Sequence, residues 1–360
     1  MSSSHVAALS TRYVPDGSSA SGGFGDVLFC IDSHLQRKVA IKTIKKLSEL
    51  PRLRDEISAL LKLRSKHVVQ VFDIVEGYDK DSFAIVMEFI DGFDLFSLDF
   101  DKLDSTNLLK LLWQISSGIA DIHAEGVIHR DIKPNNMKLD GEGILKIFDF
   151  GLARNTGAEA KTVGFKGTLG FSAPEQFTDN EVAFTQAIDV YAFGASALFL
   201  ATQNLPNELK SIPPSPINGN VFDVWILREY PDLIKLFTEC LLHDPELRPK
   251  ISKVRDVLAK HLLFDEHQAL AVINGQSHLI NKNKRTVKLG FGGIGSFELH
   301  YDGLSYHLRS AVGEVYMNNI YVNSDRQIPD SCVVGIGAGH RHYSERSFIT
   351  FDVSNPEVTL

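Results

Sequence analysis

The stretch HRDIKPNN at residues 129–136, followed by DFG at residues 149–151, decides how this chain folds. Asp131 carries a carboxylate that can accept a proton from a hydroxyl group. Asn136 and Asp149 offer amide and carboxylate oxygens, the ligands that a hard cation such as Mg²⁺ prefers. The two stretches therefore predict a site where a hydroxyl group and a magnesium ion meet.

Upstream, a glycine-rich turn and an apolar strand both carry features that favour phosphate. The run ASGGFGDV at residues 20–27 consists mostly of small residues, which allow backbone N–H groups to approach phosphate oxygens closely. The run VAIK at residues 39–42 ends in a lysine, and an ammonium group in an apolar strand needs an anion beside it. Glu56, on an expected helix, is a suitable partner. Each feature alone is weak, because glycine-rich turns and edge lysines are common.

Downstream, three further stretches complete the pattern: APE at residues 173–175, DVYAFG at residues 189–194 and DPELRP at residues 244–249. Each of them alone has an ordinary interpretation as a turn, a cap or a core segment. The order and spacing of all the stretches together make coincidence negligible.

The complete set resembles the motifs of the eukaryotic-like (Hanks-type) serine/threonine protein kinase family over about residues 12–263. The resemblance implies an α+β, bilobal protein-kinase fold for a domain of residues 1–264. Its β-rich N-lobe spans about 12–90 and its α-rich C-lobe about 91–264. The periodicity agrees, because β-type runs precede Gly92 and helical runs follow it. The expected strands are 26–31, 38–44, 68–75 and 82–89, and the expected helices are 53–64, 108–123, 183–201, 233–242 and 251–263.

The resemblance also implies catalytic roles. Asp131 orients the substrate hydroxyl and takes its proton, and Lys133 lies beside the transferring phosphate. Lys42 holds the α- and β-phosphates of ATP and pairs with Glu56. The implied ligands of Mg²⁺ are Asn136 and Asp149.

The implied ATP pocket lies between the glycine-rich turn and the link between the lobes. Met87 corresponds to the gatekeeper, Glu88 and Ile90 to the hinge that binds adenine, and Asp94 to the residue that reaches the ribose. Alanine stands at position 20, where the family has a glycine, and its small size predicts a modest effect on ATP affinity. The implied ATP-binding residues are Ala20, Gly22, Gly23, Gly25, Val27, Ala40, Lys42, Met87, Glu88, Ile90 and Asp94.

Two further features concern specificity and regulation. Lys133 after the catalytic aspartate, and Thr168 in the run GTLG, match the serine/threonine pattern of the family. Arg130 beside that aspartate favours a phosphorylated residue in the activation loop as its anion. Thr162 is the first candidate for autophosphorylation and Thr156 the second. The resemblance also implies that Asp189 braces the catalytic loop and that Glu175 pairs with Arg248.

Two other functions were weighed. A small-molecule kinase of the aminoglycoside or choline type shares the lobe plan but lacks the APE run at 173–175 and the Lys-Pro pair at 133–134. A weakly active scaffold that binds partners through its tail is the second alternative. The intact charged catalytic positions weigh against it, and an assay with radiolabelled ATP separates the two.

From about residue 265 helical periodicity gives way to short β runs punctuated by glycine. We expect a linker over 265–285 and a β-rich C-terminal domain over 286–360, folded as a small all-β sandwich. Residues 296–337 resemble the second half of a forkhead-associated domain, which implies binding of phosphothreonine peptides. The family's arginine and serine motif is not recognisable, so an unrelated sandwich that docks on a substrate or partner is the alternative. The expected core residues are Val287, Leu289, Phe297, Leu299, Tyr306, Leu308, Val315, Ile320, Val322, Val333, Val334, Ile336, Phe348 and Phe351.

Composition narrows the partners. The formal net charge of −8 favours neither nucleic acid nor an anionic membrane as a partner. The longest apolar stretch, residues 190–201, is shorter than the about twenty residues that a membrane span needs. Three cysteines without a C-x-x-C pair predict neither a disulfide framework nor a zinc site. We therefore expect a cytoplasmic protein whose substrates are proteins with Ser or Thr. Phosphopeptide binding or self-association through the tail would add a second kind of partner.

Overall fold

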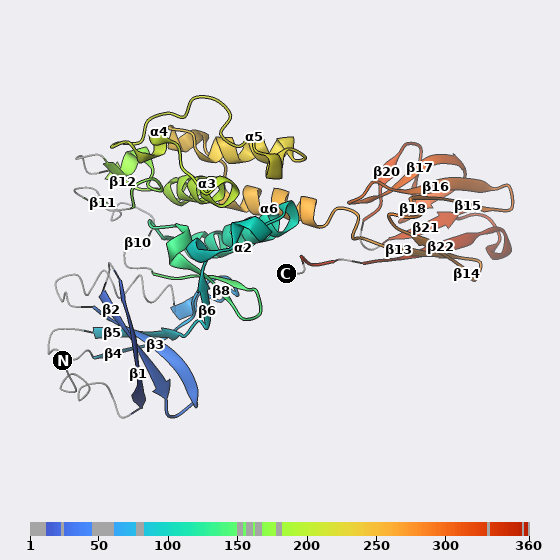
Figure 1. Cartoon of the computed structure of the whole chain (residues 1–360). Coiled ribbons are helices and arrows are strands. Elements are labelled where there is room, and N and C mark those ends of the chain that lie inside the picture. The colour runs from blue at the N-terminus through green and yellow to red at the C-terminus, as the bar shows by residue number, and fades with distance from the viewer. Residues whose placement is uncertain are drawn as a thin grey trace. The chain divides into compact units, whose positions relative to one another are not determined.

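The computed structural model describes residues 12–22, 25–44, 61–76, 83–149, 154–155, 161–162, 168–177, 182–329, 332–354 and 356–358. The chain forms two compact units, Met1–Leu258 and Ala259–Thr359 (Figure 1). Each unit is considered by itself below.

The first unit begins with a five-stranded antiparallel sheet in the order β1-β2-β3-β5-β4. Its core consists of buried apolar residues from four of these strands, among them Cys30, Val39 and Val86. The guanidinium of Arg12 donates two hydrogen bonds of 2.8 Å to the buried carboxylate of Asp32, which fixes the start of β1 against the end of β2. The strands are β1 (Tyr13–Gly22), β2 (Gly25–Asp32), β3 (Arg37–Ile44), β4 (Val71–Glu76) and β5 (Phe83–Glu88).

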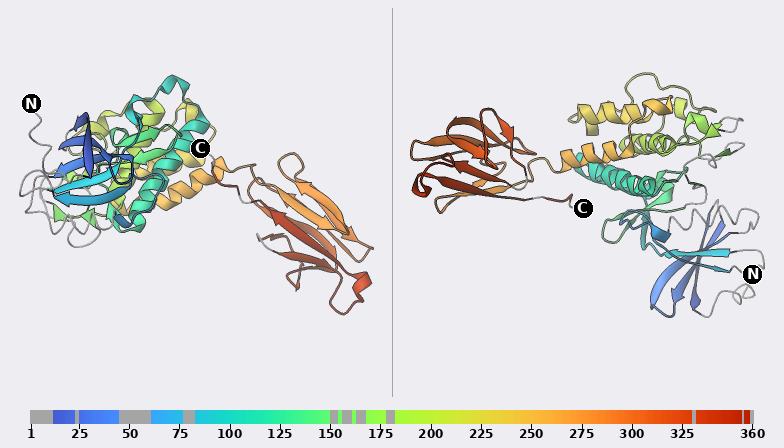
Figure 2. Two further views of the ribbon diagram at one scale, coloured as in Figure 1. Left: turned by 90° about the horizontal axis from the view of Figure 1, so that it is seen from below. Right: turned by 180° about the vertical axis from the view of Figure 1, so that it is seen from behind.

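Helices dominate the rest of this unit (Figure 2). The side chain of Asp104 caps the first long helix by accepting a 2.7 Å hydrogen bond from the backbone N–H of Asn107. The helix at 187–202 is apolar almost all round and buried along most of its length, as expected for the centre of a lobe. The helices are α2 (Ser105–Ala124), α3 (Ala187–Thr202), α4 (Asn207–Lys210), α5 (Pro231–Cys240) and α6 (Ile251–Leu262).

Short elements between the helices position the chemistry. Gly92 is required where β6 meets β8, because a Cβ atom there would lie 1.8 Å from the carbonyl oxygen of Leu139. The short strands are β6 (Gly92–Asp94), β7 (Val127–Ile128), β8 (Met137–Asp140), β9 (Leu145–Ile147), β10 (Arg154–Asn155), β11 (Lys161–Thr162) and β12 (Val182–Ala183). They pair as β6-β8-β9, β7-β10 and β11-β12. The 3₁₀ turns are η2 (Leu95–Ser97), η3 (Phe100–Lys102), η4 (Pro134–Asn136), η5 (Pro174–Phe177), η6 (Trp225–Leu227) and η7 (Pro245–Leu247).

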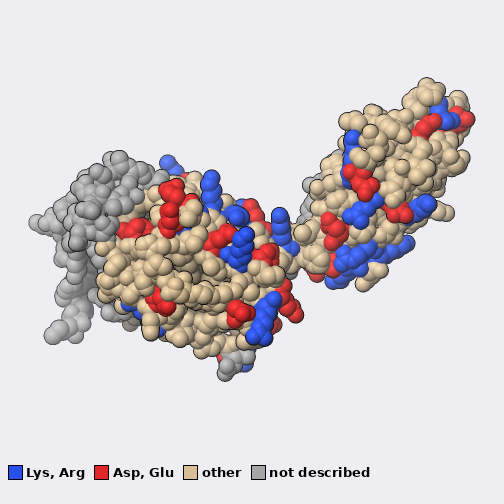
Figure 3. All heavy atoms as spheres, turned by 90° about the horizontal axis from the view of Figure 1, so that it is seen from above, with Lys and Arg blue, Asp and Glu red and all other residues tan. Residues whose placement is uncertain are grey.

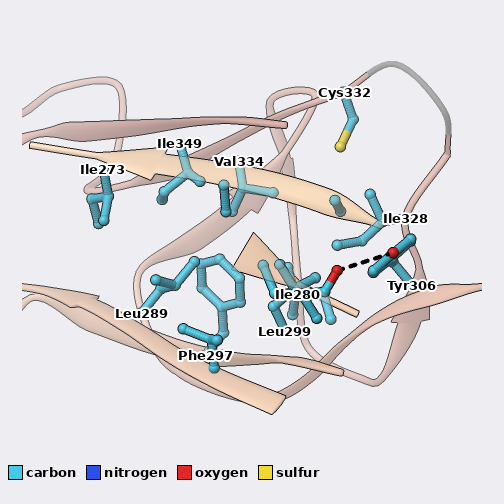
Figure 4. Close-up of a cluster of buried hydrophobic side chains, with 14 of the residues drawn as sticks. Ile273, Ile280, Leu289, Phe297, Leu299, Tyr306, Ile328, Cys332, Val334 and Ile349 are labelled. Carbon is cyan, nitrogen blue, oxygen red and sulfur yellow. Dashed lines mark hydrogen bonds between the residues drawn. The ribbon is translucent and has the colours of Figure 1, made fainter. Parts of the chain in front are cut away.

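The second unit consists of two antiparallel sheets, one of six strands in the order β14-β13-β22-β21-β18-β19 and one of four in the order β15-β16-β17-β20. Alternate residues of the strands point into the layer between the sheets and form one core (Figure 4). The hydroxyl of Tyr306 donates to the carbonyl oxygen of Ile280 within this layer. The strands are β13 (Ala269–Ile273), β14 (Gln276–Ile280), β15 (Thr286–Phe291), β16 (Gly295–Tyr301), β17 (Tyr306–Gly313), β18 (Val315–Met317), β19 (Ile320–Tyr321), β20 (Arg326–Gln327), β21 (Val333–Ile336) and β22 (Ser347–Val353), with one 3₁₀ turn, η8 (Tyr343–Glu345).

Two expectations for the tail are wrong. The linker expected over 265–285 contains β13 and β14, because Ala269, Ala271 and Ile273 alternate into the core. The expected core list also includes three residues that are exposed, Ile320, Val333 and Phe348. Val333 and Val334 are neighbours in one strand, so only one of the two can face inward.

The surface carries both signs of charge. On the face in Figure 3, acidic and basic side chains are interspersed over the first unit, and basic side chains gather along one edge of the second. Among the described residues, no helix combines the length and the apolar character that crossing a membrane requires.

Candidate active site

The catalytic loop between β7 and η4 is fixed from below by a buried carboxylate of α3. The backbone N–H groups of His129 and Arg130 each donate to Asp189 at 2.8 Å. Arg130 adopts a φ of 70°, a left-handed conformation that a branched chain environment must enforce. Asp189 thus braces the loop as predicted, with the ring of His123 also bonded to it at 2.9 Å.

The electrostatics of Asp189 explain how a charge persists there. Burial alone would raise the pKa of this carboxyl group. The hydrogen bond from His123 and the positive charge and N–H group of His129 outweigh burial, so that the pKa lies below its ordinary value. The ionised carboxylate can therefore hold both backbone N–H groups of the loop.

Asp131 has both carboxylate oxygens engaged at the surface of the loop. Thr168 donates its hydroxyl to Oδ1 at 2.8 Å, and Lys133 donates to Oδ2 at 2.7 Å. Lys133 also donates to the hydroxyl oxygen of Thr168 at 2.6 Å. The amide nitrogen of Asn136 donates to Oδ2 and to the backbone carbonyl of Asp131, both at 2.8 Å. The carboxylate is therefore oriented by three side chains at once.

Asn136 and Asp149 supply a donor set that fits Mg²⁺. The amide nitrogen of Asn136 bonds to Asp131, so its amide oxygen is the atom that can face a cation. The backbone N–H of Phe148 donates to the carbonyl of Asn136 at 3.0 Å, which places Asp149 next to η4 in space. Magnesium commonly takes one or two protein oxygens and keeps several waters, so a small set suffices. No group of three or more His, Cys, Asp or Glu side chains suited to a metal occurs among the described residues.

Lys42 reaches this donor set from the sheet. It lies on β3 between Val27 of β2 and Ile85 of β5 in register, and its side chain is 11% exposed. Its ammonium contacts the carboxylate of Asp149 at 2.5 Å. The predicted pairing of Lys42 with Glu56 lies outside the described residues.

The predicted ATP-binding residues come together on the same sheet. Ala40 is buried and lies opposite Met87 in the β3–β5 register. Gly22 and Gly25 close the β1–β2 hairpin, where Ala20 pairs with Val27. Gly23 lies outside the described residues.

The hinge follows directly after β5. The backbone N–H of Glu88 donates to the carbonyl of Gln70 at 2.8 Å, and its carboxylate pairs with Lys146 at 2.9 Å. Ile90 is half-buried, and Asp94 is exposed at the end of β6. The Lys146 contact was not predicted, because the two residues lie 58 positions apart and no motif links them.

The segment 168–177 closes the site on the other side. The backbone N–H groups of Phe171 and Ser172 both donate to the carbonyl of Thr168, at 3.0 and 3.1 Å. The side chain of Gln176 donates to the carbonyl of Arg130 at 3.4 Å. The contacts of Thr168 with Asp131 and Lys133 are the functional contacts that sequence reasoning missed, since the sequence shows only the residue type.

Glu175 and Arg248 form the predicted ion pair. The guanidinium donates to both carboxylate oxygens, at 2.6 and 2.9 Å, and also bonds three backbone carbonyls. Of the two predicted phosphorylation sites, Thr156 lies outside the described residues, and the backbone of Thr162 pairs with Val182 in β11–β12.

Comparison with known proteins supports this picture. The family model described as "Protein kinase domain" matches residues 19–261. A mitogen-activated protein kinase kinase kinase, YODA, of Arabidopsis thaliana is 28% identical over 253 residues, which is 65% of this chain and 28% of that protein. Cyclin-dependent kinase 11 of Dictyostelium discoideum is 36% identical over 182 residues, 48% of this chain and 50% of that protein. Mitogen-activated protein kinase 12 of Mus musculus is 36% identical over 183 residues, 48% of this chain and 49% of that protein. The match thus spans half or less of the length of each of these relatives.

Proposed function

This chain belongs to the protein kinase family, and from that premise we propose that it transfers the γ-phosphoryl group of ATP to serine and threonine hydroxyls of proteins. One observation carries the proposal: the carboxylate of Asp131 is buried, and Lys133, Thr168 and Asn136 hold it in place. A carboxylate fixed in this way can orient a hydroxyl group and accept its proton.

Phosphoryl transfer needs positioning and positive charge more than covalent help from the protein. Lys133, next to Asp131, is placed to neutralise charge on the transferring phosphate, and Lys42 to hold the other phosphates of ATP. Asn136 and Asp149 would hold Mg²⁺, which supplies further positive charge to the phosphate oxygens when bound. Glu56 is the proposed partner of Lys42 when ATP is in place.

We assign the adenine end of ATP to the sheet and the hinge. Val27, Ala40 and Met87 would contact the base, and the backbone at Glu88 and Ile90 would recognise its edge. The glycine-rich hairpin from Ala20 to Gly25, with Gly22 and Gly23, would cover the phosphates. Asp94 would reach the ribose, in competition with Lys138, whose ammonium lies 3.9 Å from its carboxylate.

We propose that the activation loop autophosphorylates at Thr162. The buried guanidinium of Arg130 lies 5.0 Å from the ring centroid of Phe184. Thr162 pairs with Val182, two residues before that phenylalanine, so the backbone register brings it toward the same region. A phosphate on Thr162 would supply the anion that Arg130 favours. Thr156 stays the second candidate.

For the second unit we propose a docking role for a substrate, a phosphopeptide or a second copy of the chain. The arginines considered for phosphate are Arg309, Arg326 and Arg341. Arg341 is already bound to both carboxylate oxygens of Glu314, at 2.6 and 2.7 Å. These bonds lower the pKa of Glu314 to about 2, so the pair stays charged at neutral pH. Arg309 and Arg326 are therefore the better candidates.

The remaining proposals concern partners and location. We propose that its partners are proteins, with neither nucleic acid nor a membrane among them, and that it acts in the cytoplasm. Titrating the second unit with phosphorylated and unphosphorylated activation-loop peptides tests the docking role. Tighter binding of the phosphorylated peptide supports phosphate recognition, and equal or absent binding of both contradicts it.

The assay for the proposed activity uses the full chain with radiolabelled Mg-ATP and a generic protein substrate. We expect label to appear in the protein. Asp149→Ala should abolish transfer at ordinary magnesium concentrations, because the metal loses its carboxylate. Undiminished transfer by this variant would contradict the assigned metal site.

A further inference from the structure

Four phenylalanine side chains from three segments meet beside the catalytic loop. Phe199 of α3 stacks on Phe96 of η2, with ring centroids 5.3 Å apart and planes at 8°. Phe100 and Phe171 contact the same ring at 5.9 and 6.2 Å in edge-on arrangements. We call Phe96, Phe100, Phe171 and Phe199 the aromatic group. Its rings are fixed against one another, so it presents a rigid apolar surface.

This group is continuous with the catalytic residues. The backbone N–H of Phe171 donates to the carbonyl of Thr168, and the hydroxyl of Thr168 donates to Asp131. The intervening Leu169 is 46% exposed, and Phe96 is 49% exposed. Three residues of extended chain span about 10 Å, so a polypeptide whose hydroxyl lies at Asp131 can reach this surface with a nearby side chain.

The charges around the group disfavour a basic side chain at this position. The acids on either side of Phe96 in the sequence are already paired: Asp94 lies 3.9 Å from Lys138, and Asp99 lies 2.7 Å from Lys102. An exposed phenylalanine and leucine gain most when an apolar partner removes them from water.

We propose that Phe96 and Leu169 determine substrate specificity by selecting acceptor segments with an apolar or aromatic side chain within three residues of the serine or threonine. This inference rests on the proposed kinase activity and adds to it the chemistry of the substrate. A rigid aromatic anchor next to the reacting group is the arrangement in which a single apolar contact contributes most to recognition.

The test is a set of peptides in which each position from three before to three after a serine is varied among Leu, Phe, Ser, Arg and Glu. The full-length enzyme should give the highest kcat/KM with Leu or Phe at one or more positions. Phe96→Ala should lower that preference about tenfold, the loss expected for a hydrophobic pocket contact, through a higher peptide KM. The KM for ATP should not change. Phe96→Tyr should retain the preference, and Phe96→Glu should shift it toward Arg.

Trp225→Ala is the matched control, because Trp225 is an aromatic residue of the same unit that is 69% exposed and lies outside the group. Its peptide preference should equal that of the unmodified enzyme. Transfer to serine without any apolar preference, or a preference unchanged in both Phe96→Ala and Leu169→Ala, would overturn the inference alone. Failure of the unmodified enzyme to phosphorylate any peptide or protein would overturn the proposed kinase activity, and this inference with it.

Discussion

Arg248 shows how much of the C-lobe depends on single buried residues. Its guanidinium bonds both oxygens of Glu175 and the carbonyls of Ala187, Leu242 and His243. Removing it would leave a poorly solvated carboxylate without its cation. We expect Arg248→Ala to lower the free energy of unfolding by about 3–5 kcal/mol, the usual loss for one partner of a buried pair.

Chemical denaturation of the full chain measures this change. Arg255→Ala is the control, because Arg255 pairs with Asp256 on the exposed side of α6 and should contribute less than about 1 kcal/mol. Equal effects of the two substitutions would show that the Arg248 pair does not stabilise the fold.

Asp131 is the residue on which the chemistry depends. Asp131→Asn keeps the shape of the side chain and its hydrogen bond from Thr168, but it loses the negative charge that accepts a proton. We expect kcat to fall by about 10²–10⁴, the range for loss of a general base, while the KM for ATP stays nearly constant. Steady-state kinetics with near-normal kcat would exclude Asp131 as the base.

Sequence motifs predicted single residues well where neighbours in the sequence define the role. The Glu175–Arg248 pair and the bracing of the loop by Asp189 are both present. The bonds of Thr168 to Asp131 and of Lys146 to Glu88 were missed, because they join side chains that only the tertiary fold brings together.

At the scale of elements, the segment before β4 ties the sheet to the strands of the catalytic region. Nδ1 of His67 bonds the carbonyl of Leu145 at 3.2 Å, and the backbone carbonyl of His67 accepts from Ile147 at 2.9 Å. Burial lowers the pKa of this ring from 6.5 to about 4. The folded state therefore holds it neutral where the unfolded chain would already be protonated.

A folded pKa below the unfolded value means that this stabilisation is complete above pH 6.5 and is lost as the pH falls toward 4. We expect the Tm to fall over that window and to fall less steeply in His67→Leu. His34→Leu, at an exposed turn residue, should leave the slope unchanged. Identical slopes in His67→Leu and the unmodified chain would contradict the assignment.

Strong periodicity predicted most elements, and weak periodicity hid one. The helix expected over 108–123 is α2, and the strand expected over 38–44 lies within β3. The strand β1 was missed because its sequence, YVPDGSSASG, is rich in turn residues and lacks alternation. Pairing with β2 holds it extended, with an irregularity between Pro15 and Ser19.

At the scale of the whole molecule, the second unit has its own core, and β13 is essential to it. This strand pairs with both β14 and β22, so a fragment that starts at residue 275 lacks an internal strand of the six-stranded sheet. We expect residues 265–360 to be soluble and β-rich. Residues 275–360 should aggregate, because the edge of β22 is then unpaired. Circular dichroism and size-exclusion chromatography of both fragments test this, and a folded 275–360 fragment would contradict the role of β13.

The proposed division of labour also concerns the first unit. The sequence indicated the change of character near residue 265 but not the strands just beyond it, because short runs such as Ala269–Ile273 resemble helical or linker sequence when their partners are unknown. The structure divides between Leu258 and Ala259, and α6 ends at Leu262. We expect residues 1–264 to retain phosphotransfer to a generic protein substrate. Complete loss of activity in a folded 1–264 fragment would show that the second unit takes part in catalysis.

The most direct test of the central claim is phosphoamino-acid analysis after the full chain is incubated with radiolabelled Mg-ATP, with Asp131→Asn as the matched blank. The account predicts labelled phosphothreonine and phosphoserine in the unmodified protein and almost no label in the variant. Label found mainly in phosphotyrosine, or equal label in the two proteins, would contradict it.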